Sequence, residues 1–299
     1  MPDVSVVVPL YNQADYIEEN IESLSKQSLK NFEVIVVNDG SSDNSLEIIN
    51  NLKEKYTTLD IKIINQKNCG LSCARNRGIS EAKSKYILPL DADDKLSFDA
   101  LEKYFNAINA DKSIDIVIAD TQSFAEANWV SEKHLANLKL LPYENKFNYC
   151  GLFKKTVWEE IGGYKTNMFG GYEDWEFWIN CLKKSYKFFF IKESLFFYRV
   201  KKESMLTESL KKDEYLKSKI ILNNTDIYPI ELVDKAKSNI YKKDNSQHFF
   251  YCNKTLKPNS QYICLEGSFS GYQNFGDILQ LKEAISFHKK YTKFEPIVL

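Results

Sequence analysis

The sequence predicts an α/β fold built on a doubly wound, mostly parallel sheet, and three observations support this prediction. Short apolar runs rich in β-branched residues recur along the chain, as in VSVVVPL (4–10) and FEVIVVN (32–38). Stretches with apolar residues at helical spacing separate these runs, and small polar residues follow them. Runs without polar alternation are typical of strands that are buried on both faces of a parallel sheet.

The expected elements follow one another in a regular order. Ile17, Ile21 and Leu24 recur at helical spacing between the first two runs, so residues 4–38 predict a βαβ unit with a right-handed crossover. The pattern then repeats, and it predicts helices near 46–52, 71–82 and 98–110, strands at 61–64, 86–90 and 114–120, and a less regular aromatic stretch up to residue 198.

The chain changes character after residue 205. We expect residues 1–205 to form the α/β domain and residues 206–258 to form a basic helical extension. Residues 259–299 read as an incomplete βαβ segment, with a strand at 262–268, a glycine-rich turn at 267–277, a helix near 278–285 and the strand EPIVL. Because a lone βαβ unit cannot bury both faces, we expect a chain truncated inside a second α/β domain rather than a tail docked on the first.

Composition limits the classes of function. Of the 299 residues, 43% are hydrophobic and 27% are charged, as in ordinary soluble globular proteins. The balance of 40 Lys and Arg against 41 Asp and Glu argues against a nucleic-acid binder. The N-terminal residues MPDVSVVVPLYNQ lack the pattern of a signal peptide, and the apolar run at 188–199 is interrupted by Lys192 and Glu193, so we predict no spanning helix.

The cysteines are scattered along the chain. The closest pair, Cys69 and Cys73, lacks the CxxC spacing of zinc and redox sites. We therefore interpret all six as free thiols in a reducing, cytoplasmic compartment. They are Cys69, Cys73, Cys150, Cys181, Cys252 and Cys264.

Candidate binding residues gather at the ends of the predicted strands. In doubly wound sheets, ligands bind at the carboxyl ends of the strands. Pro9 and Tyr11 lie at the end of the first strand, Asp39 follows the second, and Asp91 and Asp93 follow the fourth. An aspartate in such a loop is either a helix cap or a ligand group. The serines after Asp39 already offer caps, which favours ligand binding.

Three carboxylates crowd the stretch ILPLDADDKL (87–96). Asp91, Asp93 and Asp94 repel one another by roughly a few kcal/mol at intermediate dielectric unless a positive group lies between them. Asp91 and Asp93 project to the same face of an extended backbone, which suits a hard divalent cation bridged to a phosphate. A helix cap needs only one carboxylate, and Ser97 is better placed for that role. We therefore predict a metal or nucleotide site here.

A second acidic site lies in FGGYEDWEFW (169–178). Glu173 and Asp174 stand at a predicted helix start, where carboxylates interact favourably with the helix dipole. Tyr172, Trp175 and neighbouring aromatic residues could instead desolvate a carboxylate and make it a better base. The residues alone leave these two interpretations open.

Five motifs in this order resemble those of the family-2 glycosyltransferases of GT-A fold: VSVVVPLYNQADYIEENIESLSKQS, FEVIVVNDGSSDNS, NCGLSCARNRGI, YILPLDADD and GGYEDWEFW. The resemblance covers roughly residues 3–205. It implies an inverting hexosyl- or N-acetylhexosaminyltransferase that uses a nucleotide-diphosphate sugar, commonly a UDP-sugar, with Mn²⁺ or Mg²⁺. In such chemistry a cation stabilises the leaving diphosphate, and a carboxylate removes the proton of the acceptor hydroxyl.

The resemblance also assigns roles by position. It places the uracil against Pro9, Tyr11 and Asp39 with Arg75 nearby, the ribose at Asp91, the metal at Asp93, the catalytic base at Asp174, and the acceptor beside Glu173 and Trp175. One position departs from the family. Many relatives have a metal-binding histidine three residues after the tyrosine of a YR motif, where this chain has Lys201. A charged lysine cannot ligate a metal, so we expect Lys201 to contact the diphosphate and metal affinity to be lowered.

Two rival interpretations remain. Phosphatases of the haloacid-dehalogenase type also carry DxD after an apolar strand, but on the first strand and followed by Thr or Val, whereas Asp94 follows it here. The second rival interpretation is a non-catalytic module that binds a nucleotide sugar. The intact Asp39, Asp93 and Asp174 argue against it.

The resemblance also suggests partners and a location. We expect a glycan or lipid-linked acceptor in bacterial surface polysaccharide synthesis, and a cytoplasmic protein in peripheral contact with the inner face of the membrane. The C-terminal GxxNxGD motif resembles the opening of polysaccharide pyruvyl transferases.

Overall fold

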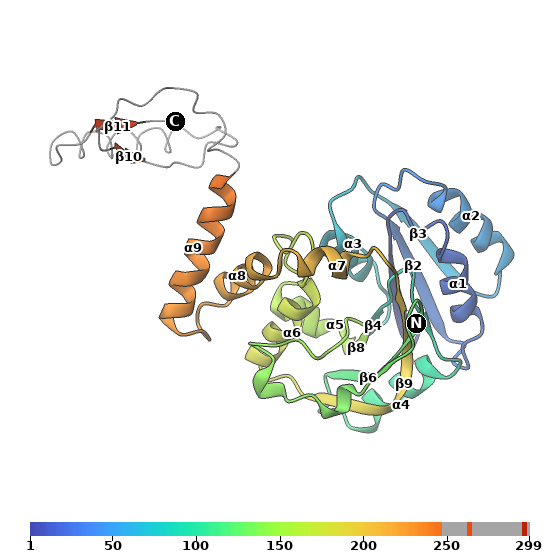
Figure 1. Ribbon diagram of the computed structural model, residues 1–299. Helices are drawn as coiled ribbons and strands as arrows, with labels where there is room; N and C mark the ends of the chain where they lie inside the picture. The colour runs from blue at the N-terminus through green and yellow to red at the C-terminus, as the bar shows by residue number, and fades with distance from the viewer. Residues whose placement is uncertain (247–261, 265–294, 298–299) are drawn as a thin grey trace. The chain divides into compact units, whose positions relative to one another are not determined.

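The computed structural model describes residues 1–246, 262–264 and 295–297. The chain divides into two compact units, Met1–Ile240 and Tyr241–Leu299. The first unit is built on one sheet (Figure 1). Its strand order is β3-β2-β1-β4-β8-β6-β9-β5, and β7 pairs with β6. The strands are β1 (Val4–Leu10), β2 (Phe32–Asn38), β3 (Asp60–Asn65), β4 (Tyr86–Pro89), β5 (Lys95–Leu96), β6 (Ile116–Ala125), β7 (Val130–Ser131), β8 (Gly151–Lys154) and β9 (Phe188–Val200).

The predicted α/β class is confirmed. The long pairings β1–β2, β2–β3 and β6–β9 are parallel, as is the short pairing β1–β4. The antiparallel pairings β4–β8, β6–β8, β5–β9 and β6–β7 each join only two or three residue pairs. The buried runs of β1 and β2 pair in register from Val4 opposite Phe32 to Leu10 opposite Asn38. Their carboxyl ends therefore lie at one edge of the sheet.

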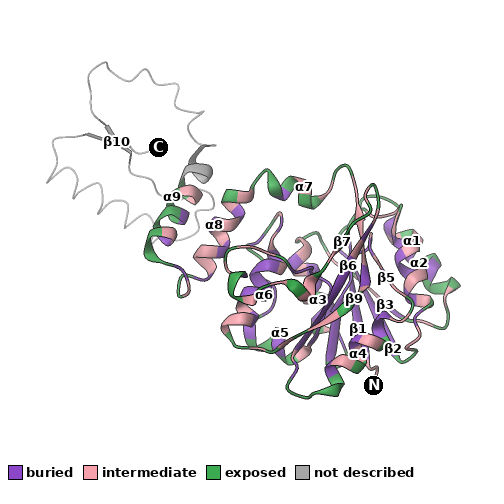
Figure 2. Ribbon diagram, turned by 60° about the horizontal axis from the view of Figure 1, so that its bottom comes forward, coloured by how far each residue is buried: buried purple, intermediate pink, exposed green. Residues whose placement is uncertain are grey.

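Helices cover both faces of the sheet. Apolar residues of α1 (Ile17–Ser25), α2 (Ser45–Lys55) and α4 (Ala100–Ala110) form one core cluster with the sheet, and those of α3 (Leu71–Ser80), α5 (Lys155–Ile161) and α6 (Glu173–Lys183) form a second. The central strands are accordingly buried, as the purple ribbons of Figure 2 show. The two-sided cover explains why β1 and β2 need apolar residues at every position.

Helix α3 packs especially closely on β1. A Cβ atom at Gly78 would lie 2.4 Å from Cγ1 of Val7 and 3.2 Å from Cγ2 of Val37. Only glycine permits this approach. The close contact fixes the depth of a helix that carries Cys73 and Arg75.

Strand β9, the last strand of this sheet along the chain, was not predicted from the sequence. Residues predicted as an irregular aromatic stretch form β9, which pairs in parallel with β6 and continues to Val200. The pairing contains register shifts near Asp120, and few residues of β9 are fully buried. The apolar run at 188–199 is interrupted by Lys192 and Glu193 and does not alternate cleanly, so it did not mark a strand.

The C-terminal part contains further helices and a small strand pair. The helices are α7 (Met205–Leu210), α8 (Asp213–Asn223) and α9 (Ile230–Ser246). In the second unit, β10 (Tyr262–Cys264) and β11 (Glu295–Ile297) pair in parallel, as a βαβ segment requires. The predicted turn at 267–277 and helix near 278–285 lie outside the described residues. Within the described part of the chain, no helix has the length and apolar character needed to cross a membrane.

Candidate active site

Hydrogen bonds join the loops at the carboxyl ends of the strands. After β1, the side chain of Asn12 accepts a hydrogen bond from the backbone N–H of Ser42, which follows β2. Asp39 after β2 accepts one from the backbone N–H of Gly70 after β3. Lys201 after β9 donates to the side chain of Gln13 after β1. The loops after β1, β2 and β3 therefore lie at one edge of the sheet, as the strand-end rule implies, and the loop after β9, a strand that the sequence did not predict, joins them.

Asp39 is held rigidly by the loop that precedes α3. Its Oδ1 accepts hydrogen bonds from Gln66 Nε2 (2.7 Å) and the N–H of Cys69 (3.0 Å), and its Oδ2 accepts from the N–H of Gly70 (2.9 Å). The carboxylate is almost fully buried. Gly70 has a φ of 90°, a conformation that favours glycine. Asp39 therefore orders the start of α3 across the strand ends.

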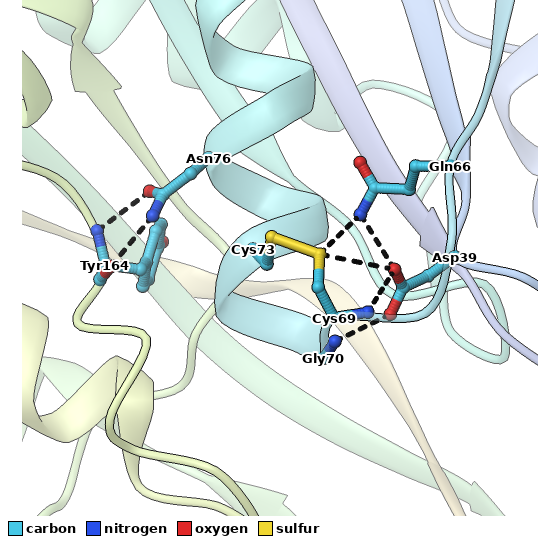
Figure 3. Close-up of a disulfide and its surroundings, with 7 residues drawn as sticks. All are labelled: Asp39, Gln66, Cys69, Gly70, Cys73, Asn76 and Tyr164. Carbon is cyan, nitrogen blue, oxygen red and sulfur yellow. Dashed lines mark hydrogen bonds between the residues drawn. A yellow bond between two sulfur atoms is a disulfide. The ribbon is translucent and has the colours of Figure 1, made fainter. Parts of the chain in front are cut away.

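A disulfide next to Asp39 corrects our interpretation of all cysteines as free thiols. Cys69 and Cys73 are bonded to each other at the start of α3 (Figure 3). Cys69 lies in the loop just before α3 and Cys73 lies in the first turn of the helix, and their Cα atoms are 5.8 Å apart, a separation that a disulfide can bridge. Cys150 and Cys181 are free, as predicted, and both are buried. Figure 3 also shows that the Sγ of Cys69 is directed toward Asp39.

Pro9 and Tyr11 lie on both sides of the end of β1. Pro9 is a buried member of the strand and pairs with Val37, whereas the side chain of Tyr11 is 49% exposed. Tyr11 is the one of the two whose ring is free to stack on a ligand.

Arg75 is a buried cation that joins two motifs far apart in the sequence. Its guanidinium donates two hydrogen bonds to Asp91 (2.8 and 3.0 Å) and one to Glu173 (2.7 Å), and its side chain is only 1% exposed. The rings of Tyr149 and Tyr164 lie 4.8 and 5.4 Å from the guanidinium carbon. Arg75 therefore contacts carboxylates and rings of the protein rather than open space where a nucleotide could bind.

The stretch Asp91–Asp94, here called the acidic loop, is fixed at its other end by residues that the sequence did not reveal. The hydroxyl of Tyr149 donates to Asp94 Oδ2 (2.5 Å) and accepts from the N–H of Asp91 (2.9 Å). Asp94 Oδ1 accepts from the N–H of Arg199 (2.7 Å). Burial, followed by the nearby Asp93 charge, holds the pKa of Asp94 well above its usual range. Tyr149 and Arg199 position this loop through Asp94, and their distance from it in the sequence hid these contacts.

Asp93 has a different partner. Its Oδ2 lies 2.5 Å from the Nζ of Lys201, and both side chains are 19% exposed. Arg199 also contacts this residue, because its Nε donates to the backbone carbonyl of Asp93 (2.8 Å). The positive partners of the acidic loop in this structure are therefore side chains of the protein, Arg75 and Lys201.

The described residues fit a divalent cation poorly. Asp93, the metal ligand that the resemblance implies, is already paired with the Lys201 ammonium. Asp91 is bound by Arg75, and both oxygens of Asp94 accept hydrogen bonds. In the part of the chain that the structure describes, no group of three His, Cys, Asp or Glu side chains could hold a metal ion. We derive no catalytic step through a metal.

Asp174 lies in the first turn of α6 at intermediate exposure. Burial, followed by the adjacent Glu173 charge, raises the pKa of Asp174 to about 7, although Arg75 opposes the shift. Its Oδ2 accepts a long hydrogen bond from Asn145 Nδ2 (3.4 Å). A carboxylate with a pKa near neutrality is well suited to take a proton and release it again.

A small cavity adjoins the start of α6. Its volume is about 170 Å³, and Trp175, Tyr143, Tyr228 and Lys217 are among the residues that line it. Trp175 follows Asp174 directly, and Tyr143 is two residues before Asn145, which contacts Asp174. Trp175 is itself nearly buried and donates from Nε1 to the carbonyl of Leu141 (2.6 Å).

These features define a GT-A type transferase: a curled, mostly parallel sheet with an acidic loop at its strand ends and a perturbed carboxylate nearby. The chain belongs to glycosyltransferase family 2. The family model described as "Glycosyl transferase family 2" matches residues 5–172, more than half of the chain.

Curated relatives agree with this assignment. An uncharacterized glycosyltransferase of Methanocaldococcus jannaschii is 30% identical over 231 residues, which cover 71% of this chain and 76% of the relative. An uncharacterized glycosyltransferase of Haemophilus influenzae is 32% identical over 193 residues, covering 62% and 73% of the two chains. A cholesterol galactosyltransferase of Borreliella burgdorferi is 39% identical over 142 residues, but this match spans only 48% of the chain and 37% of the relative.

Solved structures share the fold. Residues 1–349 of TarS from S. aureus, in complex with UDP-GlcNAc, align with a TM-score of 0.60 at 20% identity, over 82% of this chain and 73% of that one. The mannosyltransferase PcManGT from Pyrobaculum calidifontis, in complex with GDP-Man and Mn²⁺, aligns with a TM-score of 0.61 at 16% identity, over 96% and 81% of the two chains. At these identities the likeness concerns the fold.

Proposed function

We propose that this enzyme transfers a sugar with inversion from a nucleotide-diphosphate sugar, a UDP-sugar in particular, to a hydroxyl of its acceptor. Asp39 and Tyr11, with Pro9 behind them, would receive the uracil, and Asp91 would contact the ribose. Lys201 would contact the diphosphate. Asp174 would remove the proton of the acceptor hydroxyl as that oxygen attacks the anomeric carbon.

The observation that carries this proposal is the double contact of Arg75. One guanidinium binds Asp91 in the acidic loop and Glu173, the residue before Asp174. A carboxylate suited to be a base is thereby brought within one side chain's reach of the loop proposed to hold the donor. Arg75 itself takes a positioning role in this proposal, instead of the uracil contact that the resemblance implies.

A divalent cation is the competing source of positive charge for the diphosphate. Mn²⁺ or Mg²⁺ would bind through Asp93, with phosphate oxygens as its other ligands. The Mn²⁺ in the mannosyltransferase complex favours this alternative. The Asp93–Lys201 pair opposes it.

The acceptor belongs beside Asp174. The cavity next to Trp175 has a mostly apolar lining, which suits the non-reacting part of a lipid-linked acceptor better than a bare sugar. The name of the cholesterol galactosyltransferase points to a lipid acceptor in that relative. A lipid-linked surface glycan handled by a cytoplasmic enzyme at the inner face of the membrane is the corresponding proposal for this chain.

The first experiment measures donor binding and turnover. Thermal shift against UDP, GDP and their sugars should select a uridine nucleotide, because a ligand that binds only the native state raises its melting temperature. Release of UDP from the selected donor, with water or an added lipid-linked acceptor, then reports turnover. The anomeric configuration of the product, read by NMR, reports inversion or retention.

Asp174→Asn tests the base. We expect this variant to bind UDP as the wild type does and to lose turnover by about 10²- to 10⁴-fold. Glu176→Gln, on the same helix, is the matched control, because this carboxylate bonds to Asn180 and is fully buried. Equal loss of activity in both variants would assign Asp174 a structural role instead. Absence of nucleotide binding would reject the proposed function.

A further inference from the structure

Lys201 places a positive charge on Asp93, a carboxylate of the acidic loop that has no guanidinium bound to its oxygens. Its Nζ lies 2.5 Å from Asp93 Oδ2. The same ammonium donates to Gln13 Oε1 (3.3 Å) and lies 4.7 Å from the ring centroid of Tyr16. Gln13 follows β1, Tyr16 precedes α1, and Lys201 follows β9. Two segments, the loop between β1 and α1 and the acidic loop, thus hold this ammonium at the strand ends.

The other two carboxylates of the acidic loop are occupied by the protein. Asp91 accepts two hydrogen bonds from Arg75, and Asp94 accepts from Tyr149 and from the backbone of Arg199. A divalent cation at this loop would gain Asp93 alone as a carboxylate ligand. It would also lie beside the ammonium, and like charges repel. A cation at Asp93 would therefore have to displace the ammonium, whereas a phosphate oxygen could accept a hydrogen bond from Lys201 without displacing it.

We propose that Lys201, in place of a divalent cation, neutralises the diphosphate leaving group. This inference rests on the proposed function and names the catalytic group that acts on the donor. The bond between the anomeric carbon and the diphosphate oxygen breaks, and its electron pair stays on the diphosphate beside the ammonium. The acceptor oxygen forms the new bond to that carbon, and its proton passes to Asp174.

The chemistry of lysine suits this task. An ammonium is a compact charge with three donors on a flexible stem, and lysines bind phosphates in this way in other nucleotide sites. The three donors of Lys201 are enough to keep Asp93 and add a phosphate oxygen. Asp93 then acts as a positioning residue that holds the ammonium in place before the donor arrives.

Binding of UDP with and without metal tests the proposal. After metal removal with EDTA, the wild type should bind UDP in calorimetry with an affinity within about twofold of that in Mn²⁺, and turnover should behave likewise. Lys201→Met should weaken UDP binding in EDTA by about tenfold or more, since a charged hydrogen-bond partner is lost. Lys202→Met, its exposed neighbour, should bind UDP as the wild type does.

A histidine at the same position provides a gain-of-function readout. Lys201→His removes the fixed charge and adds a metal ligand. We expect this variant to bind Mn²⁺ in the presence of UDP and to require Mn²⁺ for turnover, whereas the wild type–UDP complex should show no Mn²⁺ uptake in the same titration.

The possible outcomes separate this inference from the proposed function. If EDTA abolishes wild-type turnover and Mn²⁺ restores it, or if Lys201→Met keeps full UDP affinity in EDTA, Lys201 does not replace the metal, although the enzyme remains a glycosyltransferase. If the wild type binds no UDP in either condition, the proposed function fails and this inference fails with it.

Discussion

The two aspartates of the DxD motif lie two residues apart but belong to different environments. Asp91 is bound in two places by a guanidinium that is 1% exposed and that also binds Glu173. Asp93 is bound by an ammonium that is 19% exposed, on a long and flexible stem. The two carboxylates therefore differ in their partners: Asp91 is fixed by a buried cation that also binds α6, and Asp93 is paired with a partly exposed cation on a flexible stem.

Substitution of Arg75 should have the largest effect on stability, because Arg75 binds both Asp91 and Glu173. We expect Arg75→Met to lower the free energy of unfolding by about 3–5 kcal/mol, because two carboxylates near each other lose their shared cation. Arg77→Met is the matched control on the same helix, since that side chain is 53% exposed and forms only a surface pair with Glu81. The control should change stability by about 1 kcal/mol at most. Denaturant unfolding measures both, and equal effects would contradict the description of Arg75.

Removal of the Tyr149 hydroxyl should destabilise the acidic loop less than removal of Arg75 does. Tyr149→Phe removes one group that bonds both Asp91 and Asp94, so we expect a loss of about 1–3 kcal/mol in unfolding free energy. Tyr186→Phe removes a hydroxyl that bonds Glu160 at the surface and should cost less. Thermal melts of the two variants decide, and a melting temperature of Tyr149→Phe equal to that of the wild type would show that the hydroxyl is dispensable.

The pH dependence of kcat/KM tests the role of Asp174, which follows the Arg75 partner Glu173 in the chain. Burial and Glu173 raise the pKa of Asp174 to about 7, and only the deprotonated form accepts a proton. We therefore expect kcat/KM to rise by about tenfold per pH unit below this pKa and to level off above it. The residual activity of Asp174→Asn should not show this rise with pH. A rise that persists in the variant would belong to another group.

Reduction of the disulfide should have the smallest effect. The backbone N–H of Cys69 donates to Asp39, so opening the Cys69–Cys73 bond would loosen a contact of the proposed uracil site without removing it. We expect a dithiol reductant to weaken UDP binding by less than about tenfold. The double variant Cys69→Ser, Cys73→Ser should already show the weaker affinity and should not respond to the reductant. A wild type insensitive to reduction would leave the disulfide a purely structural role.

Much of the first half of the fold could be predicted from the sequence, because local patterns determine it. The apolar runs of β1 and β2 and the helical spacing of Ile17, Ile21 and Leu24 depend only on neighbours in the chain. Strand β9 could not be predicted in this way, since its pairing with β6 is irregular and its residues are unevenly buried.

The sequence could nominate candidate site residues but not their pairings. Motifs identified Asp39, Asp91, Asp93 and Asp174, yet the sequence could not show that Arg75 joins residues 16 and 98 positions away. It also assigned the positive charge beside the acidic residues to a metal. Charge partners depend on the packing of distant segments, which composition and spacing do not reveal.

The contact of Gly78 with Val7 has a consequence for engineering donor preference. Because Gly78 has no side chain, α3 already lies as close to the sheet as it can. A side chain added at this position would push α3 away from the sheet. This displacement would carry Arg75 away from its two carboxylates. Substitutions meant to change donor preference should therefore be made at exposed loop residues such as Tyr11. Gly78 and Val7, where α3 contacts β1, should be kept.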